Sequence, residues 1–167
     1  MNLSLKFFCL SLIAVVGIWI LVDITRVYFL VKKSKTLIRQ TTPFERVIPT
    51  AKTKILVLGD STAFGTGSET PELTTAGRLG VLYPEASIKN ISKNGLKLEG
   101  LLTILDSLDS QEHFSIILVQ IGANDIIRLT SMKNIQRDAE KVFARLSKQT
   151  DKLVILHSGN IGESKLF

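Results

Sequence analysis

The strongest constraint on the fold comes from the segment Ile55 to Gly67, where an apolar run leads directly into small and turn-forming residues. The run Ile55 to Leu58 is short and branched, which is typical of a strand buried on both faces of a parallel sheet. Gly59 and Asp60 then end the strand. Ser61 is therefore expected just outside the carboxyl end of the sheet, where open α/β folds bind their ligands.

Two later segments repeat this arrangement in order along the chain. Residues 87–95 are predicted to form a strand through Ile91 and a polar turn that ends at Gly95. Residues 115–125 form the most strand-like run of the chain and lead into Asn124 and Asp125. If the three strands lie side by side, Ser61, Gly95 and Asn124 fall on one edge of one sheet.

The remaining pattern predicts a three-layer α/β/α domain. Leucines recur at helical spacing from Leu98 to Leu108, and apolar residues do so from Met132 to Leu146. A further helix is expected to begin at Thr70 and Pro71 and to run to about Leu82. With a fourth strand over 152–156, strand and helix alternate four times, which indicates a parallel sheet with helices on both faces.

A hydroxyl, a glycine and an amide at one edge are the parts that acyl transfer from an ester needs. Ser61 is the candidate nucleophile, and its backbone N–H, that of Gly95 and the Asn124 side chain are candidate donors to the oxyanion. Each residue also has a purely structural interpretation. Ser61 with Asp60 caps a helix, Gly95 supplies a left-handed turn, and Asn124 with Asp125 forms an Asx-turn.

Taken together, these three segments resemble the SGNH hydrolase family, also called GDSL esterases and lipases. Gly59, Asp60 and Ser61 match its first block, and the second and third blocks are matched by Asn90, Ser92, Gly95, Gly122, Asn124 and Asp125. The resemblance covers about residues 54–128. It implies a flavodoxin-like SGNH fold, with Ser61 as nucleophile and with Gly95 and Asn124 as oxyanion donors.

The fourth block of that family, Asp-x-x-His, is missing. The two histidines are His113 and His157, and Ser110 and Val154 stand where the aspartate would be. His113 is expected at the amino edge of the sheet, and His157 at the correct edge but more as a structural residue than as the base. We hypothesise that the 167 residues lack the C-terminal part of the fold and that the general base lies further along the complete protein.

The amino terminus predicts a membrane helix. Phe7 to Val22 carries no charge and the apolar character resumes from Val27 to Val31, so the span is expected to include Asp23 and Arg26. We favour an uncleaved anchor over a signal peptide because no small-x-small site follows. The expected organisation is an anchor over 1–33, a basic linker over 34–53 and an incomplete SGNH domain over 54–167.

Charge separates along the chain. From Arg26 to Lys54 there are eight basic residues and one acidic residue, whereas the chain from Ile55 onward has 12 basic and 13 acidic residues. The near-neutral domain argues against a nucleic-acid partner, and the basic segment suits either lipid headgroups or a solvated linker. The basic flank favours a cytoplasmic domain, while resemblance to membrane-anchored bacterial members favours the periplasmic side of the inner membrane, which we adopt.

No cofactor or metal is implied by the sequence, because it has a single cysteine, Cys9, no cluster with metal-ligand spacing, and no glycine pattern for a phosphate or dinucleotide loop. The prediction is a single-pass, membrane-anchored ester hydrolase acting through an acyl-enzyme at Ser61 on a small-molecule, lipid or glycan ester. The alternative is a membrane-tethered binding module, or an inactive homologue, that lacks the general base.

Overall fold

The computed structural model describes residues 3–156. The chain divides into two units, one ending at Gln40 and the other beginning at Thr41. The first unit is the single helix α1, Leu3–Gln40. Its 38 residues correspond to about 57 Å at 1.5 Å per residue. Residues Lys6–Gln40 have the length and the hydropathy, 2.6 in the most apolar window, of a membrane span or a signal anchor.

Helix α1 ends at Gln40, shortly before Pro43, because a residue that precedes proline is disfavoured in helical conformation. The expected linker, residues 34–53, therefore begins as helix. The second unit holds the remaining elements. Its strands are β1 (Lys54–Gly59), β2 (Ser87–Asn90), β3 (Ile116–Gln120) and β4 (Leu153–Ile155). Its helices are α2 (Ser61–Phe64), η1 (Pro71–Leu73), α3 (Thr75–Leu82), α4 (Leu98–Asp106), α5 (Ala123–Ile127) and α6 (Met132–Leu146).

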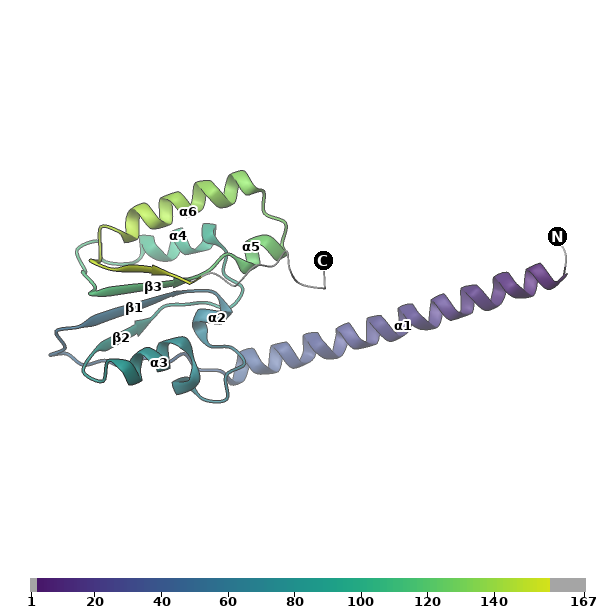
Figure 1. The fold of residues 1–167 in the computed structure, drawn as a ribbon, viewed down its shortest axis with the longest axis horizontal. Coiled ribbons are helices and arrows are strands. Elements are labelled where there is room, and N and C mark those ends of the chain that lie inside the picture. The colour runs from purple at the N-terminus through teal and green to yellow at the C-terminus, as the bar shows by residue number, and fades with distance from the viewer. Residues whose placement is uncertain (1–2, 157–167) are drawn as a thin grey trace. The chain divides into compact units, whose positions relative to one another are not determined.

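The four strands form one parallel sheet in the order β2-β1-β3-β4. In register, Ile55 of β1 lies between Ile88 of β2 and Ile116 of β3. Figure 1 shows α3 on one face of this sheet and α4 with α6 on the other. The expected α/β/α architecture is confirmed.

Alternation along β1 explains the two layers of core. Leu56 and Leu58 pack with α4 and α6, whereas Ile55 and Val57 pack with α3 and Ala63 of α2. The side chains of these four residues are fully buried, whereas Lys54 at the start of β1 is exposed. Successive residues of a strand point to opposite faces, so a central parallel strand needs apolar residues at every position.

One expected helix is interrupted. The stretch predicted as helical from Thr70 to Leu82 is a short 3-10 turn, η1, followed by α3, and Thr74 separates them. The Thr74 hydroxyl accepts a hydrogen bond from the Gly77 backbone N–H at 3.0 Å, so it caps α3. The sequence pattern missed this cap because Thr70 with Pro71 is an equally good start signal.

The free edge of β2 is covered by residues from the segment expected to be linker. Arg46 pairs antiparallel with Ile88 through two backbone hydrogen bonds of 2.9 and 2.7 Å. Its guanidinium donates to the carbonyl oxygens of Gly80, Tyr83 and Ala86. Cations stabilise the carbonyl end of a helix, so Arg46 fixes the end of α3 as well as the sheet edge.

Candidate functional site

The site begins where β1 ends, at a point that only glycine fits. A Cβ on Gly59 would lie 1.9 Å from the carbonyl oxygen of Gln120 on β3, and the φ of Gly59 is 154°. The Asp60 backbone N–H donates to that same carbonyl at 3.0 Å. This close approach of two strand ends turns the chain outward immediately before Ser61.

Ser61 is the first residue of the one-turn helix α2. The Asp60 carboxylate caps this helix by accepting hydrogen bonds from the backbone N–H (2.9 Å) and the hydroxyl of Thr62. Gly65 ends it in left-handed conformation, with φ 92°. Ser61 is half-buried, and its hydroxyl makes no hydrogen bond with any residue in 3–156. The serine is thus held by backbone contacts while its hydroxyl stays available.

Two side-chain hydrogen bonds fasten the end of β2 and the loop after it to α2 and the residues that follow α2. The Asn90 amide donates to the carbonyl oxygen of Ala63 at 3.1 Å, and the Thr66 hydroxyl bonds the Asn94 side-chain oxygen at 2.5 Å. Gly95 follows Asn94 with a φ of 73°, which a residue with a side chain rarely adopts. The loop that carries Gly95 is therefore tied directly to the loop that carries Ser61.

The loop after β3 is joined to the same place. Gly122 precedes α5 with φ 115°, and the Asn124 amide then donates to the carbonyl oxygen of Leu96 at 3.2 Å. The buried Asp125 carboxylate accepts from the Leu98 backbone N–H at 3.1 Å. A primary amide has two N–H donors, so Asn124 keeps one after bonding Leu96.

Three of the four buried polar side-chain atoms that lack a partner among the described residues also belong to these strand ends. They are Asp60 Oδ2 after β1, Ser92 Oγ after β2 and Gln120 Oε1 at the end of β3. Buried polar atoms in proteins almost always bond to protein or to ordered water. Arg128 also belongs to this region, because its Nη2 lies 3.0 Å from the position that a Cβ on Gly95 would occupy. No sequence motif marks Gln120, Thr66 or Arg128.

The histidines are separated from this edge or lie outside the described residues. His113 is exposed, precedes β3, and has Nε2 3.6 Å from Asp151 Oδ1 just before β4. Both residues stand at the amino ends of their strands, away from Ser61. His157 lies outside the described residues. Within residues 3–156 no histidine stands at the carboxyl edge.

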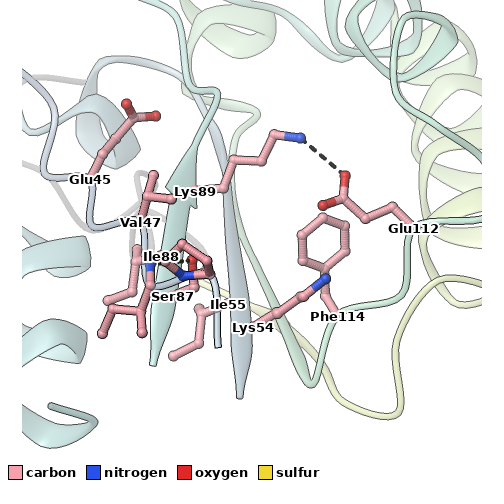
Figure 2. Close-up of a pocket in the computed structure, with 11 residues that line it drawn as sticks. Glu45, Val47, Lys54, Ile55, Ser87, Ile88, Lys89, Glu112 and Phe114 are labelled. Carbon is pink, nitrogen blue, oxygen red and sulfur yellow. Dashed lines mark hydrogen bonds and ion pairs between the residues drawn. The ribbon is translucent and has the colours of Figure 1, made fainter. Parts of the chain in front are cut away.

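A surface cavity of the domain lies at the opposite, amino edge of the sheet. It measures about 450 Å³ and lies between residues 45–49 and the first residues of β1 and β2. Figure 2 shows Lys89 and Glu112 pointing toward each other beside it, and their charged atoms are 3.0 Å apart. None of its lining residues belongs to the three loops around Ser61. The candidate site is therefore located by the chemistry of the strand ends and not by this cavity.

Comparison with known proteins identifies the family. A model of the GDSL-like lipases and acylhydrolases matches residues 55–165, about two thirds of the chain. The chain belongs to this family. The match spans all three loops described above, and no curated protein sequence matches the chain.

Several solved structures share the fold of this GDSL-like chain. A G-D-S-L family lipolytic protein from Veillonella parvula is 16% identical, with TM-score 0.53 and coverage of 62% of this chain and 57% of the other. A lipolytic protein of that family from Desulfitobacterium hafniense is 19% identical, with TM-score 0.56 and coverage of 66% and 63%. The esterase EstA from Pseudoalteromonas sp. is 25% identical, with TM-score 0.53 and coverage of 70% and 68%. The chain thus spans about three fifths of the length of the first two structures.

Proposed function

We propose that this GDSL-like chain is a membrane-anchored serine hydrolase of carboxylic esters. The Ser61 hydroxyl oxygen attacks the ester carbonyl carbon, a general base takes its proton, and the alcohol leaves with that proton. Water then releases the acid from the acyl-enzyme. The family match and the available hydroxyl of Ser61 support this role.

A single observation carries the proposal: hydrogen bonds on both sides of Gly95 connect it to the other two loops. Thr66 bonds Asn94 on one side, and Asn124 bonds Leu96 on the other. This arrangement supports an oxyanion hole made by the backbone N–H groups of Ser61 and Gly95 and the second N–H of Asn124. Donors fixed before the reaction stabilise the tetrahedral oxyanion without reorganisation.

The general base in this proposal comes from outside the described residues. The base must reach the Ser61 hydroxyl, and His113, the histidine within 3–156, stands at the opposite edge of the sheet. Leu156 donates its backbone N–H to Val119 at 2.8 Å, so the chain leaves β4 at the Ser61 edge. In this proposal the base belongs to the part of the protein that follows Leu156.

The substrate is proposed only as a class, a carboxylic ester of a small molecule, lipid or glycan. No cofactor takes part in the proposed steps. The proposed location is the bacterial inner membrane, with α1 as the single span and the domain on the periplasmic side. The hydropathy of Lys6–Gln40 supports the span.

The second candidate is a tethered binding module that holds an ester or acyl group in the same pocket without cleaving it. The observation in its favour is that the described residues place no histidine beside Ser61. The two functions differ in whether Ser61 becomes a nucleophile.

A fluorophosphonate probe separates them, because it phosphonylates only an activated serine. The full-length protein in detergent would be treated with the probe, digested and examined by mass spectrometry. We expect labelling of Ser61, its loss in Ser61→Ala, and its retention in Ser68→Ala, a serine of the same loop. Binding of an ester analogue without any labelling would support the binding module instead. A probe that reacts equally with the Ser61→Ala variant would refute the hydrolase proposal.

A further inference from the structure

The segment after Asn124 exposes an unusual amount of apolar side chain. Ile126, Ile127, Leu129 and Met132 lie within seven residues, and their exposed fractions are 49%, 72%, 90% and 75%. Single exposed apolar residues are normal on soluble proteins, whereas a cluster indicates an interaction site. We refer to residues 126–133 as the α5 surface.

The backbone presents these side chains on a fixed turn. Leu129 has a left-handed φ of 55°, a conformation that costs an L-residue about 1 kcal/mol or more. The turn is held by hydrogen bonds from the Leu129 backbone N–H to Ile126 (3.0 Å) and from the Thr130 N–H to Asp125 (2.8 Å). Asp125 is itself anchored to α4. The most exposed apolar side chain of this turn is thus held outward despite a local cost.

Cationic side chains flank the cluster in the sequence of the two segments that meet here. Residues 92–97 and 126–133 together contain Lys93, Lys97, Arg128 and Lys133 and no acidic residue. Lys97 Nζ donates to the Thr130 hydroxyl at 3.1 Å, which joins the two segments. Arg128 Nη2 lies 3.0 Å from the position that a Cβ on Gly95 would occupy, and Arg128 forms no ion pair among residues 3–156.

Exposed apolar side chains with flanking cations are the chemistry that binds an anionic lipid surface. Apolar groups enter the boundary between headgroups and acyl chains, and each nearby Lys or Arg adds about 1 kcal/mol of attraction to an anionic surface. We propose that the α5 surface docks on phospholipid headgroups that carry negative charge, with Ile127 and Leu129 inserted and Arg128 and Lys97 on phosphates.

Docking in this way would open the Ser61 site toward the bilayer, since the α5 surface follows Asn124 directly and Arg128 lies against Gly95. The inference rests on the membrane anchoring by α1 proposed above. It does not depend on Ser61 being a nucleophile. Coverage of the same side chains by another segment or by a second copy of the chain is the competing outcome.

Site-specific fluorescence in vesicles tests the inference on the full-length protein. In a Cys9→Ala background, Ile127→Cys would carry an environment-sensitive nitrobenzoxadiazole label, and the protein would be reconstituted in phosphatidylcholine vesicles with or without phosphatidylglycerol. Lipids with spin labels on the acyl chain serve as quenchers. Leu82→Cys is the matched control, because Leu82 is 71% exposed but lies just before β2, at the opposite edge of the sheet.

We expect a blue-shifted emission and several-fold stronger lipid quenching at position 127 than at position 82, in vesicles with phosphatidylglycerol. The difference should shrink in Arg128→Gln/Lys97→Gln and disappear without the anionic lipid. Leu129→Cys should behave as Ile127→Cys does. A blue shift without lipid quenching would mean that protein covers the surface and would overturn the inference. Equal quenching at 127 and 82, or none at 127, would overturn it as well.

Discussion

The two edges of the sheet use polar residues in opposite ways. At the amino edge, Arg46 bonds three carbonyl oxygens, Ser87 bonds Arg46 and Ile48, and Lys89 pairs with Glu112. At the carboxyl edge, the Ser61 hydroxyl and three buried polar atoms have no partner among the described residues. Gln149 Oε1, just before β4, is the one such atom at the amino edge among the described residues. The amino edge therefore pairs most of its polar groups within the fold, and we propose that the unpaired groups of the carboxyl edge face a ligand.

The largest expected effect is on catalysis at the carboxyl edge. Ser61→Ala should lower ester hydrolysis by the full-length protein by about 10⁶-fold in kcat, as loss of a nucleophile does in serine hydrolases. The measurement is hydrolysis of a p-nitrophenyl ester, with Ser68→Ala as the control that keeps its rate. A small change in Ser61→Ala would assign the reaction to another residue.

The next largest effect is expected on stability, at the backbone turn that positions Ser61. Gly59→Ala should destabilise the domain by about 3 kcal/mol or more, because the new Cβ meets the Gln120 carbonyl oxygen. Gly67→Ala is the control: it has a positive φ of 94° but open space around it, so it should cost about 1 kcal/mol. Thermal unfolding of the detergent-solubilised protein measures both. Equal losses of stability in the two variants would mean that the ends of β1 and β3 do not approach closely enough for a Cβ on residue 59 to clash.

Asn124→Ala should lower kcat by about 10² to 10³, the usual cost of one oxyanion donor, with a small loss of stability from the bond to Leu96. Asn134→Ala, on the exposed first turn of α6, should change neither quantity. Steady-state kinetics and thermal unfolding of the same samples make the comparison. If Asn124→Ala lowered stability strongly and kcat little, the role of Asn124 would be structural, like that of the polar groups at the amino edge.

At the amino edge we expect the opposite pattern, a loss of stability without a loss of kcat. Arg46→Met should cost about 2 kcal/mol of stability, since its guanidinium bonds to three carbonyl oxygens, while leaving kcat unchanged. Arg78→Met, an exposed arginine on α3 with no side-chain hydrogen bond among the described residues, is the matched control and should cost little. A fall in kcat for Arg46→Met without a fall in stability would break the proposed division between the edges.

The smallest effect is expected at the strained turn of the α5 surface. Leu129→Gly should raise the free energy of unfolding by about 0.5 kcal/mol, because glycine adopts the positive φ without strain. Part of this stabilisation is lost, since glycine also has greater freedom in the unfolded chain. Leu82→Gly, at the helical end of α3, should lower it by a similar amount. Destabilisation by Leu129→Gly would show that Leu129 packs against protein.

Much of the fold and of the candidate site at the carboxyl edge could be predicted from the sequence, because these features depend on local patterns. The apolar run of β1 and the glycines after it placed Ser61 at a strand end, and helical spacing fixed α6 at its observed bounds. The loops of Gly95 and Asn124 followed from the same alternation. These features need only residues that are close in sequence.

The rest depends on partners far away in the chain. In the sequence, Arg46 looks like part of a basic linker, and no neighbouring residue indicates that its hydrogen-bond partners lie about 40 residues later in the chain. Likewise, Thr66 and Arg128 acquire their places beside Asn94 and Gly95 only when the strands align. The unpartnered atoms of Asp60, Ser92 and Gln120 appear only after every other bond is assigned.

The central claim is that three loops surround a single carbonyl group. A crystal structure of the full-length protein after reaction with an ethyl fluorophosphonate tests it most directly, because the phosphonylated serine mimics the tetrahedral intermediate. We predict phosphorus on the Ser61 oxygen and its free oxygen about 2.7 to 3.1 Å from the backbone nitrogens of Ser61 and Gly95 and from Asn124 Nδ2. An adduct whose oxygen points away from Gly95 and Asn124 would contradict the account.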